Sequence, residues 1–225
     1  INYAFFAPTF TGATNGWIPL DDDAVADAPS PPTTQKAIFG FGYNGSSYLS
    51  LTNLVSSSGV VASDTTGVGT ARRFLAATGY GEDKAIFGYG DTGSEVSLTN
   101  LVSNLGVVGS DVTGVGTIRK SLAAARYGTD KAIFGYGTGS SLFSLTNLVS
   151  NTGVVSSDVS GVGTNRTALA AAGYGGDKAI FGYGDTPSLV SMTNLVSNTG
   201  VVSADVTGVG TNRNGLAAAG YSRSA

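Results

Sequence analysis

The chain has 225 residues, a formal net charge of −3 and 41% hydrophobic residues, which favours a packed core over a disordered chain. Cysteine and histidine are absent, so disulfides, thiolate nucleophiles, Cys/His metal sites and His-dependent triads are excluded. No Lys/Arg-rich stretch stands out, and no apolar run approaches the ~18 residues of a membrane helix. We therefore expect no nucleic-acid binding and no membrane insertion.

Residues 1–35 differ from the rest of the chain. Ile1–Phe6 is apolar and extended in character, and its Ala-Phe-Phe is a degenerate copy of a later Ala-Ile-Phe. Thr14–Ile18 stands in for a later Thr-Asn-Leu-Val strand, and the acidic cluster Asp21–Asp23 begins a loop. We predict a degenerate N-terminal unit here, with Ile1–Phe6 as a strand.

A tandem repeat follows. Lys-Ala-Ile-Phe-Gly begins at Lys36, Lys84, Lys131 and Lys178, which are 48, 47 and 47 residues apart. A fixed period of this length is the sequence mark of a repeat architecture. The tandem copies span 36–221, and we predict a single domain over residues 1–225.

Residues 83–129 illustrate the predicted elements of one copy. Lys84–Gly90 is an apolar strand, and Val96–Ser103 alternates apolar and polar residues as a half-buried strand does. Val107–Val112 is predicted as a third strand. Ser121–Tyr127 has the alanine content of a helix, but it is short and bracketed by glycine turns, so we predict a fourth strand.

Four short strands per period of about 47 residues predict an all-β fold, a β-propeller of four-stranded antiparallel blades. A β-solenoid is the main rival, but its coils usually have shorter periods. Four Ala-Ile-Phe strands and the N-terminal unit predict five blades. Pairing of Ile1–Phe6 with Leu216–Tyr221 would complete a blade from both ends of the chain and close the ring.

The pattern Arg-x-x-Leu-Ala-Ala-Ala-x-Tyr-x-x-Asp-Lys-Ala-Ile-Phe-Gly-Tyr-Gly, over 166–184, resembles kelch-type propeller repeats. In that family an Arg precedes an apolar strand, a turn and an aromatic-containing strand that ends in glycines. The resemblance covers about 36–221, although Gly-Tyr-Gly replaces the family's double glycine. The family's last-strand tryptophan is missing, since the only tryptophan is Trp17. The near-identical copies are also similar to tandem-repeat proteins of marine bacteriophages, which implies a virion or an extracellular, cell-surface location.

Charged residues recur at the same place in each copy. One interpretation is a ring of carboxylates that lines a channel and binds cations. A structural network explains better why every copy carries the same aspartate and arginine, because enzymes seldom need four equivalent catalytic sites. We therefore predict a structural repeat network and no metal site. Its residues are Asp64, Arg72, Asp111, Arg119, Asp158, Arg166, Asp205 and Arg213.

The turns after each Gly-Tyr/Phe-Gly vary between copies, and loops on a rigid scaffold often carry function. Drift at surface turns gives the same appearance. A second variable patch follows the repeated arginine, at 73–74, 120–121, 167–168 and 214–215. The predicted ligand-binding residues are Asn44, Ser46, Tyr48, Asp91, Thr92, Glu95, Thr138, Ser140, Asp185, Thr186 and Ser188.

These patterns favour a non-catalytic structural or adhesive protein without a cofactor, such as a tail, fibre or capsid-associated component of a phage. Its expected partners are other structural proteins, a cell-surface glycan bound multivalently, or further copies of the chain. A glycoside-active enzyme that uses unrepeated carboxylates (Asp21–Asp23, Glu82 or Glu95) is the alternative. A module that only assembles proteins is the third.

Overall fold

The computed structural model describes residues 8–10, 17–19 and 36–221. Contacts divide the chain into two units, Ile1–Gln35 and Lys36–Ala225, at the boundary between the degenerate N-terminal unit and the tandem copies. In the first unit β1 (Pro8–Phe10) pairs antiparallel with β2 (Trp17–Pro19), and Thr9 lies opposite Ile18. The predicted strand Ile1–Phe6 and the acidic cluster Asp21–Asp23 lie outside the described residues.

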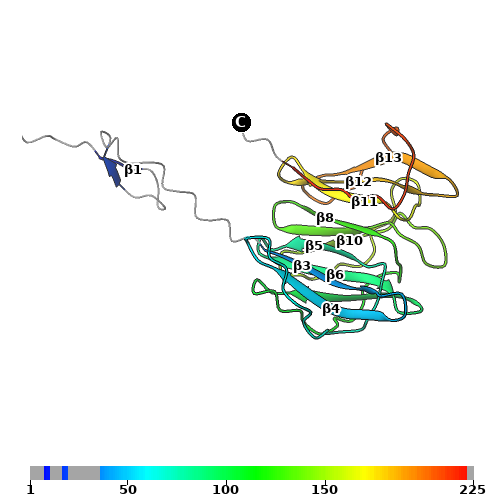
Figure 1. Ribbon diagram of the computed structural model, residues 1–225. Helices are drawn as coiled ribbons and strands as arrows, with labels where there is room; N and C mark the ends of the chain where they lie inside the picture. Colours follow the sequence, from blue (N-terminus) through cyan, green and yellow to red (C-terminus); the bar gives the residue numbers. More distant parts are fainter. Residues whose placement is uncertain (1–7, 11–16, 20–35, 222–225) are drawn as a thin grey trace, which may run out of the picture. The chain divides into compact units, whose positions relative to one another are not determined.

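The second unit is built from four small antiparallel sheets, one for each tandem copy (Figure 1). The first sheet contains β3 (Ala37–Tyr43) and β4 (Tyr48–Val55), and the second contains β5 (Ala76–Tyr80), β6 (Lys84–Asp91) and β7 (Glu95–Val102). The third contains β8 (Ala123–Tyr127), β9 (Lys131–Gly135) and β10 (Thr146–Val149), and the fourth β11 (Ala170–Tyr174), β12 (Lys178–Asp185) and β13 (Leu189–Val196). The predicted all-β class is confirmed, and the alanine-rich segments are strands.

The segment that follows the Thr-Asn strand in each copy is not a full strand. In the second copy it touches β7 only through isolated bridges, Thr99 with Val112 and Val102 with Val108. The Asn100 side chain on β7 explains the interruption, because its Nδ2 donates to the carbonyl of Gly109 at 3.0 Å. This side-chain bond takes the place of a regular backbone ladder. The prediction of a strand over Val107–Val112 was therefore only partly correct.

In the first, second and fourth copies the Gly-Phe-Gly or Gly-Tyr-Gly forms a β-bulge rather than the plain end of a strand, whereas β9 of the third copy ends at Gly135. The register between β6 and β7 shifts between Gly88 and Gly90, and Tyr89 between them has φ 64°. A left-handed backbone in a non-glycine residue costs about 1 kcal/mol or more and persists only where packing holds it. Here the Tyr89 ring is fully buried, and burial raises its pKa to about 12.

The hydrophobic core lies between successive sheets, which stack on one another in Figure 1. A phenylalanine of each sheet packs on the bulge aromatic of the sheet before it, as Phe134 does on Tyr89 with ring centroids 5.3 Å apart. The glycine that precedes the bulge makes room for this ring. A Cβ on Gly88 would lie 2.7 Å from Phe134, so a larger residue there would clash with the next sheet.

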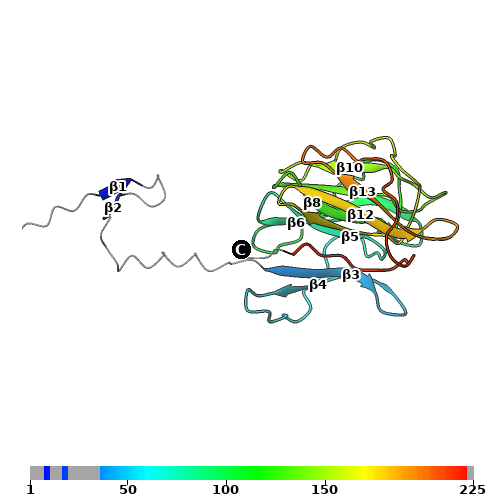
Figure 2. The ribbon, with the colours of Figure 1, turned by 90° about the horizontal axis from the view of Figure 1, so that it is seen from above.

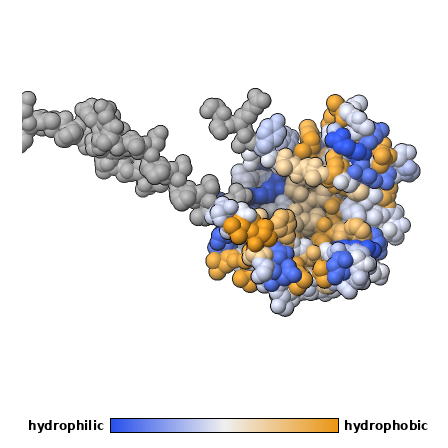
Figure 3. Space-filling model, in the orientation of Figure 1, coloured by the Kyte–Doolittle hydropathy of each residue, from blue (hydrophilic) through white to orange (hydrophobic). Residues whose placement is uncertain are grey.

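Backbone hydrogen bonds join the sheets beside the alanine-rich strands. The amide of Ser121 donates to the carbonyl of Phe74 at 2.8 Å, Ala168 to Ser121 at 3.0 Å, and Gly215 to Ala168 at 2.9 Å. Apolar residues gather over the middle of this face, where β5, β8 and β11 run (Figure 3).

The stack of sheets is open within the described residues. The first sheet lies to one side of the others when seen from above (Figure 2), and none of the sheets closes into a ring. Leu216–Tyr221 forms no strand and pairs with none of the described strands.

Candidate functional site

Three of the recurring arginines, Arg72, Arg119 and Arg166, are buried, and each binds an asparagine and lies near an aspartate of the copy that follows it. Within the described residues Arg213 and Asp64 have no such partners. Arg119 is completely buried, and its guanidinium donates to the carbonyls of Tyr136 at 2.9 Å and Thr117 at 3.0 Å and to the Asn147 side chain. The carboxylate of Asp158 lies 3.7 Å away. The guanidinium also lies 4.3 Å from the Tyr89 ring of the preceding sheet, so this network fastens one sheet to the next.

Arg72 and Arg166 repeat these contacts with Asn100 and Asn194. In the part of the chain that the structure describes, Arg166 Nε is the one buried side-chain polar atom that lacks a hydrogen bond. Burial lowers the pKa of Arg72 to about 10, which still leaves it charged at neutral pH.

The network carboxylates are held ionised. Burial alone would raise the pKa of Asp158, but hydrogen bonds from Thr117 and Asn147 outweigh burial and leave the pKa below its usual value of 3.8. Asp111 and Asp205 behave in the same way. A carboxylate whose pKa is lowered by folding stabilises the protein above its unfolded pKa, and this contribution is lost as the pH falls through the folded pKa.

We therefore expect the free energy of unfolding to fall between about pH 5 and pH 2, and to fall less steeply in Asp158→Asn. Urea denaturation at several pH values measures this slope. Asp64→Asn is the matched control, because Asp64 is the first-copy equivalent and receives a hydrogen bond only from Asn53 among the described residues. Equal slopes in wild type and Asp158→Asn would contradict the assignment.

The two variable patches meet at one edge of the stack. The residue after each of the first three repeated arginines pairs with the hairpin turn of the nearby sheet, as Arg73 does with Asp91 through backbone bonds of 3.0 and 2.8 Å. Lys120 pairs with Thr138, and Thr167 with Asp185, in the same way. We call this surface the variable edge; it contains residues 43–48, 91–95, 138–142 and 185–189 and the pairs 73–74, 120–121, 167–168 and 214–215.

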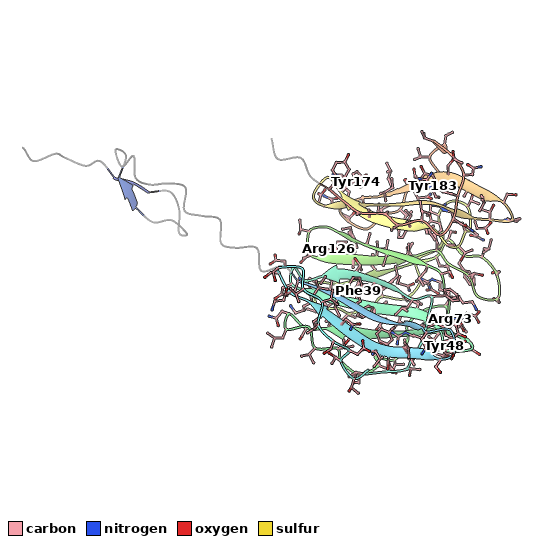
Figure 4. The ribbon with its side chains drawn as sticks, in the orientation of Figure 1. Phe39, Tyr48, Arg73, Arg126, Tyr174 and Tyr183 are labelled. Carbon is pink, nitrogen blue, oxygen red and sulfur yellow. The ribbon has the colours of Figure 1, made fainter. Side chains whose placement is uncertain are left out.

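An aromatic and cationic cluster occupies the variable edge at its first-copy end. The rings of Tyr43 and Tyr48 lie 5.7 Å apart, and the Arg73 guanidinium lies 5.0 and 5.2 Å from them and 4.7 Å from the Phe74 ring. Arg73 and Tyr48 lie side by side in Figure 4. Tyr43 is 47% exposed and Phe74 50% exposed, so ring surface faces solvent.

The next part of the variable edge is charged. Lys120 Nζ lies 2.9 Å from the Glu95 carboxylate and 3.8 Å from that of Asp91, which Arg73 also approaches at 3.3 Å. The hydrogen bond with Lys120 lowers the pKa of Glu95 and raises the pKa of Lys120. A general acid for glycoside cleavage needs a raised carboxyl pKa, so Glu95 is poorly suited to that role.

Several predicted ligand-binding residues instead hold the turns together. The Asn44 side chain accepts hydrogen bonds from the amides of Ser46 and Ser47 at 3.0 and 2.8 Å. The hydroxyls of Thr92, Thr138 and Thr186 donate to carbonyls two or three residues ahead in their own turns. Ser46, Ser140 and Ser188 are exposed, and Asp185 accepts a bond of 3.3 Å from Asn214.

The sequence interpretation did not include Tyr43, Arg73, Phe74 or Lys120 among the predicted binding residues. Their variability after the arginine was the available signal, but it did not show that the two patches are neighbours. A hollow of about 470 Å³ lies elsewhere, between Arg126, Tyr174, Lys178 and Tyr221. Within 8–10, 17–19 and 36–221 no three acidic residues cluster as a metal site, and no helix is long and apolar enough to cross a membrane.

No protein-family model matches this chain, and a search of curated proteins finds no similar sequence.

Proposed function

We propose that the chain is a non-catalytic structural or adhesive module that binds a multivalent ligand through the variable edge. The observation that carries this proposal is the meeting of both variable patches on one edge of an otherwise repeated framework. A rigid scaffold whose variable turns line up along one edge is an arrangement expected of a binding protein.

The sheets are proposed to be kelch-like propeller blades with a period of about 47 residues. The recurring arginine, the order of strands in each sheet and the stacking of successive sheets support this interpretation. A five-bladed ring would need a fifth blade that includes residues from 1–35. A virion or extracellular location is proposed from the similarity to phage repeat proteins and from the composition without cysteine and histidine.

A surface glycan is the ligand class that suits the first-copy end of the variable edge best. The apolar faces of sugar rings stack on exposed aromatic rings, and sugar hydroxyls accept hydrogen bonds from guanidinium groups. Tyr43, Tyr48, Phe74 and Arg73 offer both kinds of contact together. The other copies supply different polar groups along the same edge, so one extended polymer would contact several of them.

A glycan array probed with the full chain tests this proposal. We expect binding that Tyr48→Ala and Arg73→Ala each weaken about tenfold or more, which corresponds to one lost stacking or charged contact. Lys84→Ala is the control, because Lys84 is an exposed lysine paired with Asp83 in the turn before β6, outside the variable edge. An array without signal, or binding that the edge variants leave unchanged, would reject the glycan proposal.

The enzyme alternative has its own test. Turnover on a polysaccharide panel that Glu95→Gln or Glu82→Gln abolishes would replace the non-catalytic proposal. The ion pair of Glu95 with Lys120 argues against that result. A module for protein assembly alone would show neither binding nor turnover.

A further inference from the structure

The two ends of the sheet stack are incomplete in complementary ways. The second, third and fourth sheets each contain an alanine-rich strand, an Ala-Ile-Phe strand and a Thr-Asn strand, in that spatial order. The first sheet contains β3 and β4 but no alanine-rich strand among the described residues. At the other end, Ala217–Tyr221 repeats the sequence pattern of β5 but has no described strand to pair with.

This last segment already occupies the position of an alanine-rich strand. A Cβ on Gly220 would lie 2.5 Å from the carbonyl oxygen of Gly173 on β11, and a Cβ on Gly173 would lie 3.5 Å from that of Arg126 on β8. The segment therefore lies beside β11 in the same position that β11 takes beside β8. In the second sheet Ala76 lies opposite Gly88 and Tyr80 opposite Lys84. The same register between Ala217–Tyr221 and a β3 strand would place Ala217 opposite Gly40 and Tyr221 opposite Lys36.

The aromatic packing is also left incomplete at both ends. Gly40, Gly88 and Gly135 each face a phenylalanine ring of the following sheet, at 3.0, 2.7 and 2.7 Å from a built Cβ. At Gly182 the only neighbour within 4 Å among the described residues is Thr193, so none of their phenylalanines fills the space that one fills elsewhere. Phe39 is the equivalent phenylalanine of the first sheet, and it is 63% exposed.

The partners of one charged network are also split between the two ends, with the arginine at the C-terminal end and the asparagine and aspartate at the first sheet. Arg213 stacks on Tyr183 at 4.1 Å as the other arginines do on their aromatics, but it bonds to neither an asparagine nor an aspartate in the described part of the chain. Asn53 and Asp64 bond to each other at 2.8 Å and are the equivalents of the partners that Arg119 uses.

The N-terminal segment does not offer the missing arginine. The residue 47 positions before Arg72 is Val25, and the one 47 positions before Thr70 is Asp23. The Thr70 hydroxyl donates a hydrogen bond to Asp111 of the following copy. An aspartate in the equivalent position before the first copy would instead repel Asp64.

We propose that the open end at β3 and β4 of one copy of this chain docks on the C-terminal end of a second copy. Ala217–Tyr221 of one copy pairs with β3 of the other and completes a three-stranded sheet. Phe39 fills the space over Gly182, and Arg213 binds Asn53 and Asp64. The joint then repeats the contacts that already hold the interior sheets together, and it is independent of the proposed glycan binding.

A second copy is favoured over closure of the chain on itself. Within the described residues, Ala217–Tyr221 does not pair with β3 of its own chain. No strand pairing joins the first sheet to the fourth either, so the described chain leaves both ends unpaired. Such head-to-tail contacts build rings or filaments, because each copy keeps one free end of each kind.

Sedimentation velocity over a range of protein concentrations tests the proposal with the full chain. We expect the wild type to form species larger than the monomer. Arg213→Ala removes one end of the contact and Phe39→Ser the other, and each is expected to be monomeric, with the dissociation constant raised about 100-fold or more. An equimolar mixture of the two variants retains one intact contact and should stop at the dimer.

Leu105→Ser is the matched control, since Leu105 is highly exposed in a turn of an interior copy and should leave assembly unchanged. Asp64→Ala is a second variant of the Phe39 end, in case Phe39→Ser fails to fold. A wild-type chain that stays monomeric, as it would if its own residues covered both ends, overturns the proposal. Single variants that assemble like wild type, or a mixture that stays monomeric, also overturn it.

Discussion

Arg119→Ala is expected to lower the free energy of unfolding by about 3–5 kcal/mol, the usual cost of removing one partner of a buried charged network. The substitution leaves the Asn147 side chain and the Tyr136 carbonyl without their buried donor, and it empties the space over the Tyr89 ring. A domain of this kind has a total stability of about 5–15 kcal/mol, so the loss is large. Urea denaturation followed by far-ultraviolet circular dichroism measures this loss of unfolding free energy.

Arg126→Ala is the control for this prediction. Arg126 is partly exposed and its side chain makes one hydrogen bond, to the Thr129 carbonyl at 2.6 Å, so the expected loss is below about 1 kcal/mol. Arg119→Lys should remain destabilising, because a lysine cannot reproduce the planar set of donors. Equal losses for Arg119→Ala and Arg126→Ala would mean that the buried network does not hold the sheets together.

Phe134→Ala is expected to cost about 3–5 kcal/mol, the usual range for deleting a buried phenylalanine side chain. Phe134 is fully buried and packs between Gly88 and Tyr89 of the preceding sheet, where the rigid bulge limits collapse of the cavity. Phe39→Ala removes the same side chain from the exposed position in the first copy. In dilute protein it should cost less than about 1 kcal/mol.

The comparison of the two phenylalanines is made by denaturation at a protein concentration low enough to keep the chain monomeric. Similar costs at both positions would mean that Phe39 is covered by part of the same chain. That result would also contradict the open arrangement of the first sheet.

The period of the sequence was the most reliable signal. Each Lys-Ala-Ile-Phe-Gly run is a strand, and the alanine-rich segments that precede three of these runs are strands that pair with them. The bulge at Gly-Tyr-Gly was missed, since a tyrosine with positive φ has no signature of its own in a sequence. The interruption of the predicted strand Val107–Val112 was missed because it depends on the Asn100 side chain. In the sequence Asn100 looks like an ordinary strand residue.

The candidate site could be predicted only in part. Variation between copies indicated the turns and the residues after the arginine as candidates. Their meeting at one edge depends on the pairing of Arg73 with Asp91, which joins residues 18 positions apart. Sequence also could not show that Asn44 and Thr92 would be used by their own turns, because a turn asparagine and a ligand-binding asparagine look the same.

Amide hydrogen exchange is the most direct test of the central claim, that equivalent sheets stack through one recurring contact and that the outer face of each end sheet lacks it among the described residues. In dilute protein the amides of β6 and β9 should be protected about 100-fold or more above those of β3, although the three strands have nearly the same sequence. Protection of β3 equal to that of β6 and β9 in the monomer would contradict the claim.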